Sequence, residues 1–318
     1  MIIVALKGGL GNQLFQYALG RHLAIKNSDA LKLDLTALQD AEQIGNIHRD
    51  YRLSEFMIQA DVANKADIEK LKPKPSLLSK ISVKIRNRLI GDPTVIYNPK
   101  FLEQTDDIYL DGYWQSPLYF ESIRDTLLKE LVMIKPLSKP AAGFLEQIKN
   151  NTSIALHVRR GDYIKNPQVQ REFGPCSLSY YKNAIQEMEK DVKNPTYFVF
   201  SDDLLWVKKN LPVGERAVFV EGEGMTDVED LVLMSMCQHN IIANSSFSWW
   251  GAWLNQNPGK IVIAPTPWFD RQPYDKNLIP ESWIQIPKHG LNWSSLQKVE
   301  PSSALWGFSS DEERIAAQ

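Results

Sequence analysis

The feature that most constrains this chain is an apolar run, residues 153–158, that ends abruptly in charged side chains. The run is rich in residues that favour β structure, so it predicts a buried strand. Arg159, Arg160 and Asp162 follow directly, and unpaired charges are almost never fully buried. Because open α/β sheets bind ligands at the carboxyl ends of their strands, this cluster predicts a site where guanidinium groups meet phosphate. A structural network of arginine and aspartate is the alternative that these residues alone leave open.

Strands and helices alternate through both halves of the chain. The expected strands cover residues 1–6, 31–35, 153–158, 196–201, 217–220, 240–243 and 261–264, with another running into an aromatic turn over 108–116. The expected helices cover residues 14–26, 60–71, 119–131, 138–149, 179–190, 204–211, 227–236 and 247–255. This alternation predicts two Rossmann-like domains with parallel sheets. A proline-bracketed linker at 136–140 divides them, so we expect an N-terminal domain over 1–137, a C-terminal domain over 138–290 and a loosely ordered tail over 291–318.

A glycine-rich turn follows the first expected strand. Gly9 and Gly11 match the first two glycines of a dinucleotide fingerprint, and Asp34 lies at a suitable distance downstream, but Leu14 stands where the third glycine belongs. The match to a nicotinamide or flavin site is therefore weak. Glycines still let backbone N–H groups approach an anion, and the turn continues into Asn12 and Gln13, which add neutral donors at the start of a helix.

Three expected strands of the second half end in polar residues. These ends are 157–162, 201–203 and 244–246, and in a parallel sheet they meet at one edge. The combination predicts a nucleotide pocket, in which Arg159 holds phosphate, serines at a helix start add donors, and a carboxylate such as Asp203 accepts from guanine. Each residue has a simpler reading, since Asp202 and Ser245 also fit helix caps and the tryptophans of 249–253 fit a core. Asp202 and Asp203 together also fit a Mg²⁺ site, although no Asp-x-Asp motif is present and two arginines are available to neutralise a diphosphate.

Bulk composition excludes some functions. The chain has 318 residues and a formal net charge of −2, which argues against nucleic acid or an anionic membrane as the main partner. No apolar run approaches the roughly 20 residues that span a bilayer, and the first residues lack the basic start of a signal peptide. The two cysteines lie far apart and fit a reduced compartment. We therefore expect a cytoplasmic protein, and the basic residues 80–88 leave peripheral contact with the inner face of a membrane open.

Five segments together resemble one known family, the α-1,2-fucosyltransferases of glycosyltransferase family 11. They are residues 8–16 (GGLGNQLFQ), 112–116 (GYWQS), 157–162 (HVRRGD), 200–203 (FSDD) and 244–254 (NSSFSWWGAWL). The resemblance implies a GT-B fold, in which two Rossmann-like domains face each other across a cleft. It also implies inverting transfer of L-fucose from GDP-β-L-fucose to the 2-hydroxyl of a terminal β-galactose, on a free or lipid-linked oligosaccharide, with neither a metal nor a cofactor.

The resemblance also implies which residues form the site. Arg159 is expected to bind the β-phosphate, Ser245 or Ser246 the diphosphate, and His157 and Asp203 the guanine. The expected donor-binding residues are Gly9, Gly11, Asn12, Gln13, His157, Arg159, Arg160, Ser201, Asp202, Asp203, Asn244, Ser245, Ser246 and Phe247. The expected catalytic residues are Arg159, Asp162 and Asn12, and Asn12 would position the acceptor hydroxyl. The general base stays open, with Asp162 beside the arginine and His48 and Asp50 on the acceptor side as candidates.

Overall fold

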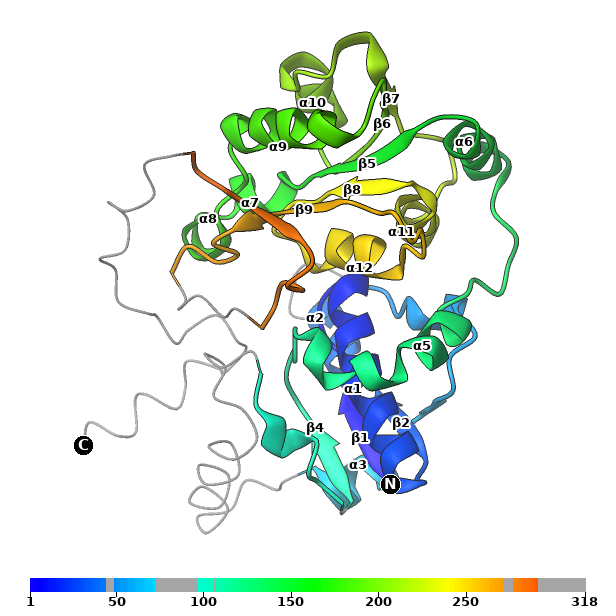
Figure 1. Ribbon diagram of the computed structural model, residues 1–318. Helices are drawn as coiled ribbons and strands as arrows, with labels where there is room; N and C mark the ends of the chain where they lie inside the picture. The colour runs from blue at the N-terminus through cyan, green and yellow to red at the C-terminus, as the bar shows by residue number, and fades with distance from the viewer. Residues whose placement is uncertain (44–48, 73–96, 106, 272–276, 291–318) are drawn as a thin grey trace, which may run out of the picture.

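The computed structural model describes residues 1–43, 49–72, 97–105, 107–271 and 277–290, and these form two parallel sheets, one below the other in Figure 1. The lower sheet has the strand order β3-β2-β1-β4, and the upper sheet has the order β10-β9-β8-β5-β6-β7. The strands are β1 (Ile2–Ala5), β2 (Leu31–Asp34), β3 (Asp61–Val62), β4 (Ile108–Leu110), β5 (Ser153–Val158), β6 (Thr196–Ser201), β7 (Ala217–Phe219), β8 (His239–Ile241), β9 (Val262–Thr266) and β10 (Ile284–Pro287). The helices are α1 (Leu10–Asn27), α2 (Thr36–Gln43), α3 (Lys65–Leu71), α5 (Arg124–Glu130), α6 (Lys139–Lys149), α7 (Gly161–Lys165), α8 (Pro167–Phe173), α9 (Leu178–Asp191), α10 (Leu204–Asn210), α11 (Asp227–Met236) and α12 (Ser246–Leu254).

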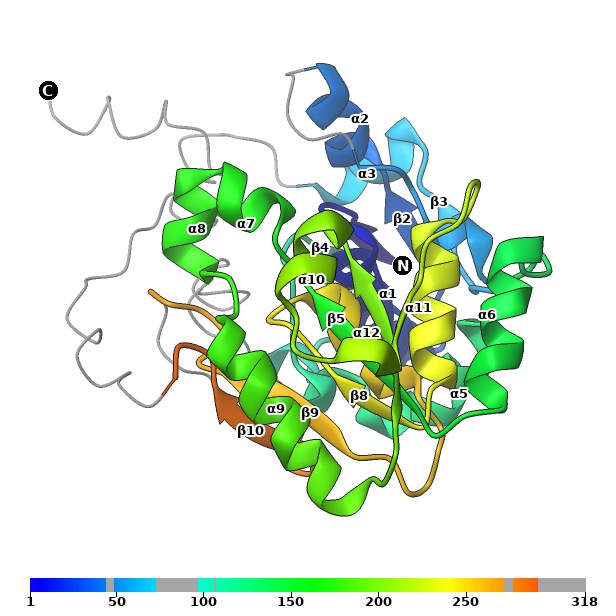
Figure 2. The same ribbon diagram turned by 90° about the horizontal axis from the view of Figure 1, so that it is seen from above.

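Strand β5 lies at the centre of the upper sheet and is buried along its whole length. It pairs in parallel with β6 and β8, so that Leu156 stands opposite Val199 and Ile241. Helix α9 covers one face of this sheet, and α6, α11 and α12 cover the other, with α6 and α11 side by side in Figure 2. A strand covered on both faces is apolar at successive positions, which explains the continuous apolar run in the sequence.

An aromatic cluster joins the two sheets. Phe15 of α1 lies 4.6 Å from Trp249 and 5.1 Å from Trp250 of α12, measured between ring centroids. Phe120 stacks on Trp250 at 5.2 Å and Trp253 packs against both, so that one hydrophobic core contains residues of both halves of the chain. Helix α12 therefore connects β8 and β9 of the upper sheet in the chain, while its aromatic side chains pack against residues of the first half.

The predicted α/β fold with two Rossmann-like parallel sheets is confirmed, and so is the core position of Trp249, Trp250 and Trp253. The strands of the first sheet all precede residue 137 and those of the second all follow it, while the boundary itself stays a prediction. None of the described helices is long and apolar enough to cross a membrane. The basic residues 80–88 and the tail 291–318 lie outside the described residues.

Several local predictions were wrong. The helix expected over 60–71 begins only at Lys65, because Asn64 caps it with a capping box and the preceding residues form β3. The helix expected over 119–131 is reduced to 3-10 turns followed by α5. Helices α7 and α8 and the edge strand β10 were not predicted, since their residues are few and mostly polar or proline-flanked.

Candidate functional site

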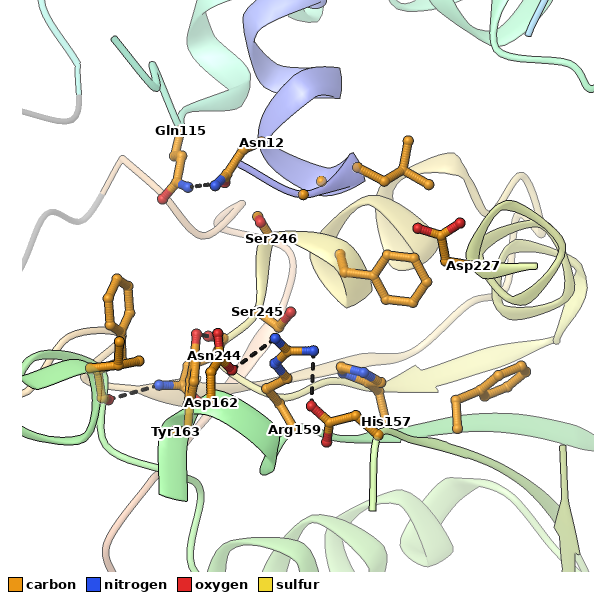
Figure 3. A pocket seen from close by; sticks show the side chains of 18 of the residues that line it. Asn12, Gln115, His157, Arg159, Asp162, Tyr163, Asp227, Asn244, Ser245 and Ser246 are labelled. Atoms are coloured by element: carbon orange, nitrogen blue, oxygen red, sulfur yellow. Dashed lines mark hydrogen bonds and ion pairs between the residues drawn. The ribbon is translucent and has the colours of Figure 1, made fainter. Parts of the chain in front are cut away.

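A pocket of about 470 Å³ lies between the carboxyl ends of the two sheets (Figure 3). From the first half it is lined by Gly9, Leu10, Gly11, Asn12, Arg49, Tyr113 and Gln115. From the second half it is lined by His157, Arg159, Asp162, Tyr163, Val169, Glu172, Phe173, Phe200, Ser201, Asp202, Asp227, Asp230, Asn244, Ser245, Ser246, Phe247 and Trp268. In Figure 3, His157 and Asp227 lie at one end, Tyr163 and Asn244 at the other, and Arg159 between them. The pocket has the size and the mixed polar and aromatic lining of a small-ligand site.

Arg159 follows β5 directly, and two carboxylates fix its guanidinium in the pocket. One terminal nitrogen lies 2.8 Å from Asp162 Oδ1 and the other lies 2.9 Å from Asp202 Oδ2. Gly161 permits this arrangement, because a Cβ there would lie 2.6 Å from the Asp202 carboxylate. The two ion pairs pre-orient the planar fork toward a ligand that presents paired oxygens.

Arg160 and Asp203 do not line the pocket, and their predicted place in the donor site stays a prediction. The Arg160 Nε donates to Asp203 Oδ2 at 3.1 Å, and its guanidinium stacks on Trp206 at 3.6 Å. Asp203 also caps α10 by accepting from the Trp206 backbone N–H. The neighbouring Asp202 lines the pocket instead. The two aspartates thus serve different arginines, in contrast to the Mg²⁺ pair considered from the sequence.

His157 is a buried, neutral imidazole at one end of the pocket. Burial lowers the pKa of its ring to about 3, so that the charged form is absent at neutral pH. Its ring lies 5.7 Å from the Phe247 ring, and its buried Nδ1 has no partner among the described residues. Buried polar atoms are nearly always paired, so an unpaired ring nitrogen is an unusual feature of this end of the pocket.

Two aspartates of α11 line the pocket, and Asp227 lies at its His157 end in Figure 3. Asp227 forms an ion pair with Arg52 at 3.2 Å. Asp230, one turn later, has no ion pair with the described residues, and burial together with Asp227 and Glu229 raises its pKa to about 7. Both had the sequence pattern of helix-start residues, so their part in the pocket was missed. A carboxyl group in such a setting is a candidate functional group.

The first turns of α1 and α12 meet beside the pocket. A Cβ on Gly11 would lie 2.4 Å from the Ser246 carbonyl carbon and 2.5 Å from the Phe247 nitrogen, so the contact requires glycine. Ser245 stands before α12 and makes no capping hydrogen bond with its side chain, and Ser245 and Ser246 both line the pocket. Two helix starts thus direct their positive ends toward the same space.

The glycine turn of the first half contributes Asn12 but not Gln13. The Asn12 Oδ1 accepts from Gln115 Nε2 at 2.8 Å at the pocket edge (Figure 3). Gln13 is fully buried, donates to the carbonyls of Gly8 and Asp50, and accepts from the Arg52 backbone N–H. The amide of Gln13 thus holds two loops together, and its predicted donor-binding role stays a prediction.

The aromatic turn over 112–116 contributes one residue to the pocket and one to the core. Tyr113 lines the pocket, whereas Trp114 is buried in the core against Phe101. Of the proposed bases, His48 lies outside the described residues, and Asp50 does not line the pocket.

Asn244 lines the pocket, but its side-chain amide is hydrogen-bonded to backbone carbonyls of the protein. Its amide nitrogen donates to the carbonyls of Phe173, Gly174 and Trp268 at 2.8, 2.9 and 3.1 Å. Its own carbonyl accepts from the Tyr163 hydroxyl at 2.9 Å. Asn244 thus fixes the loops that form the Tyr163 end of the pocket.

Comparison with known proteins gives one consistent result. The model of the family described as "Glycosyl transferase family 11" matches residues 99–287, more than half of the chain. An α-1,2-colitosyltransferase of Escherichia coli is 33% identical over 91% of this chain and 99% of its own length. The O-antigen biosynthesis glycosyltransferase WbnK of Escherichia coli is 31% identical over 88% of this chain and 99% of its own length. The crystal structure of the NodZ α-1,6-fucosyltransferase soaked with GDP-fucose aligns with a TM-score of 0.47 at 15% identity, over 81% of this chain and 96% of that one.

Proposed function

Because the chain belongs to glycosyltransferase family 11, we propose that it transfers L-fucose from GDP-β-L-fucose to the 2-hydroxyl of a terminal β-galactose, with inversion and without a metal ion. The observation that carries the proposal is Arg159, whose guanidinium is pre-oriented by Asp162 and Asp202 in the middle of the pocket. A diphosphate bound there would place the nucleotide base toward His157 and the sugar toward Tyr163.

The chemistry follows from the charges that develop during transfer. Breaking the bond between the sugar and the β-phosphate leaves negative charge on GDP and positive charge on the sugar ring. Arg159 and the N-terminal ends of α1 and α12 oppose the charge on the departing diphosphate, so they bind the transition state better than the ground state. Ion pairs with two aspartates keep the guanidinium in place before the reaction, which reduces the reorganisation required.

The base end of the pocket suits guanine. Guanine presents two adjacent N–H donors, which a single carboxylate accepts together. Asp203 lies outside the pocket and Asp227 is paired with Arg52, so we assign this role to Asp230.

GDP affinity is expected to rise as the pH increases through about 7, because Asp230 must lose its proton to accept from guanine. Asp230→Asn should abolish this dependence and weaken GDP binding at high pH about tenfold, the loss expected for a hydrogen bond to a charged group. Calorimetric titration of GDP across the pH range measures both effects. A native affinity that stays constant with pH would contradict the assignment.

The stability of the protein should fall as the pH rises, whereas its affinity for GDP should rise. The native state holds the Asp230 proton up to about pH 7, whereas the unfolded chain releases it near the ordinary aspartate pKa of 3.8. The free energy of unfolding therefore falls as the pH rises through this interval, and Asp230→Asn should remove that part of the fall. Urea unfolding at several pH values provides this control on the binding result.

The relative named α-1,2-colitosyltransferase supports GDP-colitose as an alternative donor substrate. Colitose is fucose without its 3-hydroxyl, so the two nucleotide sugars differ by one polar group. Incubation of the protein with GDP-fucose or GDP-colitose and a β-galactoside, with EDTA present, distinguishes the candidates through their kcat/KM values. Absence of transfer from either donor would reject the proposed function, and transfer that requires added metal would reject its metal-free form.

The acceptor proposal rests on the relative named for O-antigen biosynthesis, which supports an oligosaccharide acceptor. A panel of free and lipid-linked β-galactosides would identify it. Location in the cytoplasm stays a prediction of the sequence.

A further inference from the structure

Glu172 is a buried carboxylate in the pocket wall that the proposed donor site does not use. It lies on α8, is only 3% exposed, and lines the pocket. Its carboxylate has no hydrogen bond or ion pair within the described part of the chain. Burying an unpaired carboxylate is costly, so such a group in a pocket wall indicates a function. We infer that Glu172 is the general base that accepts the proton of the acceptor hydroxyl, an inference that rests on the proposed sugar transfer.

The other carboxylates of the pocket are less suited to this role. Asp162 and Asp202 are both held by the guanidinium of Arg159, at 2.8 and 2.9 Å. Asp227 is paired with Arg52, and Asp230 lies on α11 at the end assigned to the base. A general base needs an oxygen that is not already bound to a cation and that lies beyond the sugar, and Glu172 meets the first requirement.

The position of Glu172 relative to Arg159 meets the second requirement. The Arg159 guanidinium lies 5.8 Å from the centre of the Tyr163 ring. The Tyr163 ring stacks on the Phe173 ring, with centroids 5.4 Å apart and an interplanar angle of 29°. Glu172 immediately precedes Phe173, so one aromatic ring separates the phosphate ligand from the segment that carries the carboxylate. A sugar attached to a phosphate at Arg159 would lie beside that ring, and the inference places its far side toward the segment that carries Glu172.

Backbone hydrogen bonds hold this segment firmly. The Glu172 carbonyl accepts from the Asp270 N–H at 2.7 Å, and the Phe173 carbonyl accepts from Asn244 Nδ2 at 2.8 Å. Lys288, whose side chain is completely buried, also donates to the Phe173 carbonyl and forms an ion pair with Asp270 at 2.7 Å. A catalytic carboxylate requires such a fixed position, because small displacements cost large factors in rate.

The acceptor oxygen forms a bond to the anomeric carbon from the side opposite the diphosphate. Its proton passes to the Glu172 carboxylate, and the bond from the anomeric carbon to the β-phosphate oxygen breaks with its electron pair leaving on GDP. The protonated Glu172 then releases its proton to solvent after the products depart.

The test compares Glu172→Gln with the parent protein. Glutamine keeps the shape of the side chain but accepts no proton, so kcat for transfer to a β-galactoside should fall by on the order of 10²–10⁴. The Kd of GDP-fucose and the KM of the acceptor should stay within about threefold of the parent values, since the lost interaction is made during proton transfer. Glu172→Asp, which retains a displaced carboxylate, should give an intermediate kcat. The same charge removal at the exposed Glu215, as Glu215→Gln, should leave kcat unchanged.

Two outcomes would overturn the inference. One is a kcat of Glu172→Gln within about tenfold of the parent value, because general base catalysis contributes more than that. The other is a loss of donor or acceptor affinity that equals the loss of kcat/KM, which would make Glu172 a binding residue. Failure of the proposed function is distinguishable, since the parent protein itself would then transfer no sugar. Thermal unfolding checks the fold, and Glu172→Gln should unfold no earlier than the parent because it replaces a buried carboxylate that has no partner among the described residues.

Discussion

Arg159→Lys is expected to lower kcat/KM for sugar transfer by on the order of 10²–10³, although the positive charge is conserved. The Arg159 guanidinium contacts Asp162 with one terminal nitrogen and Asp202 with the other, and it presents its remaining donors to the pocket. A lysine ammonium is a compact point charge and cannot reproduce this planar fork. The loss should appear mainly in kcat, because the charge on the departing diphosphate is greatest in the transition state.

Arg160→Lys is the matched control for this prediction. Arg160 is the next residue, but its guanidinium stacks on Trp206 and pairs with Asp203 outside the pocket. Its replacement should change kcat/KM less than tenfold. Steady-state kinetics with GDP-fucose measure both variants, and near-native turnover of Arg159→Lys would remove Arg159 from its proposed role. Equal losses in the two variants would show that the ion-pair network as a whole, and not the pocket fork, supports activity.

The sequence predicted the framework of this site because its signals are local. A continuous apolar run predicts a strand buried on both faces, and polar residues directly after such runs lie at the carboxyl edge of a parallel sheet. His157, Arg159 and Ser245 were located by this reasoning, and the structure places all three in one pocket. Their roles toward a donor stay proposals.

The sequence could not decide between neighbouring residues that point in different directions. Arg159 and Arg160 are chemically identical, and the chain turns immediately after β5, so strand alternation no longer applies. The sequence likewise does not show which of Asp202 and Asp203 faces the pocket. In the structure Asp203 caps α10, and Asp202 lines the pocket. For the arginines, the direction of Arg160 depends on packing against Trp206, a contact distant in sequence.

Asp230 and Glu172 show a second limit. Both lie on helices, where an acidic residue is usually solvated, and neither belongs to a recognisable motif. Their burial arises from tertiary packing, because α11 lies against β5 and α8 is held by residues near 270 and 288. Local patterns contain no information on such contacts, so functional acids of this kind are found only in the folded chain.

The largest expected effect on stability is that of Trp249→Ala, which should lower the free energy of unfolding by about 3–5 kcal/mol. Trp249 is completely buried and lies at the junction of the two halves of the chain. Its ring packs against Phe15 at 4.6 Å and Trp283 at 5.5 Å, and its Nε1 donates to the Leu278 carbonyl at 3.0 Å. Truncation would leave a large cavity and an unpaired carbonyl, and both are destabilising.

Unfolding of this variant should remain a single transition. The core that contains Trp249 includes residues of α1 and β1 as well as α12 and β9, so the first sheet depends on α12 for its core and one face of the second sheet depends on the first half. Urea unfolding followed by both circular dichroism and tryptophan fluorescence tests this, because coincident curves indicate one cooperative unit. Trp206→Ala is a suitable control, since Trp206 is half-buried on α10 outside this core, and it should cost clearly less. Two separated transitions would instead show that the aromatic cluster does not make the two halves unfold together. The position of one pocket wall relative to the other would then depend on the contact of α1 with α12 at Gly11.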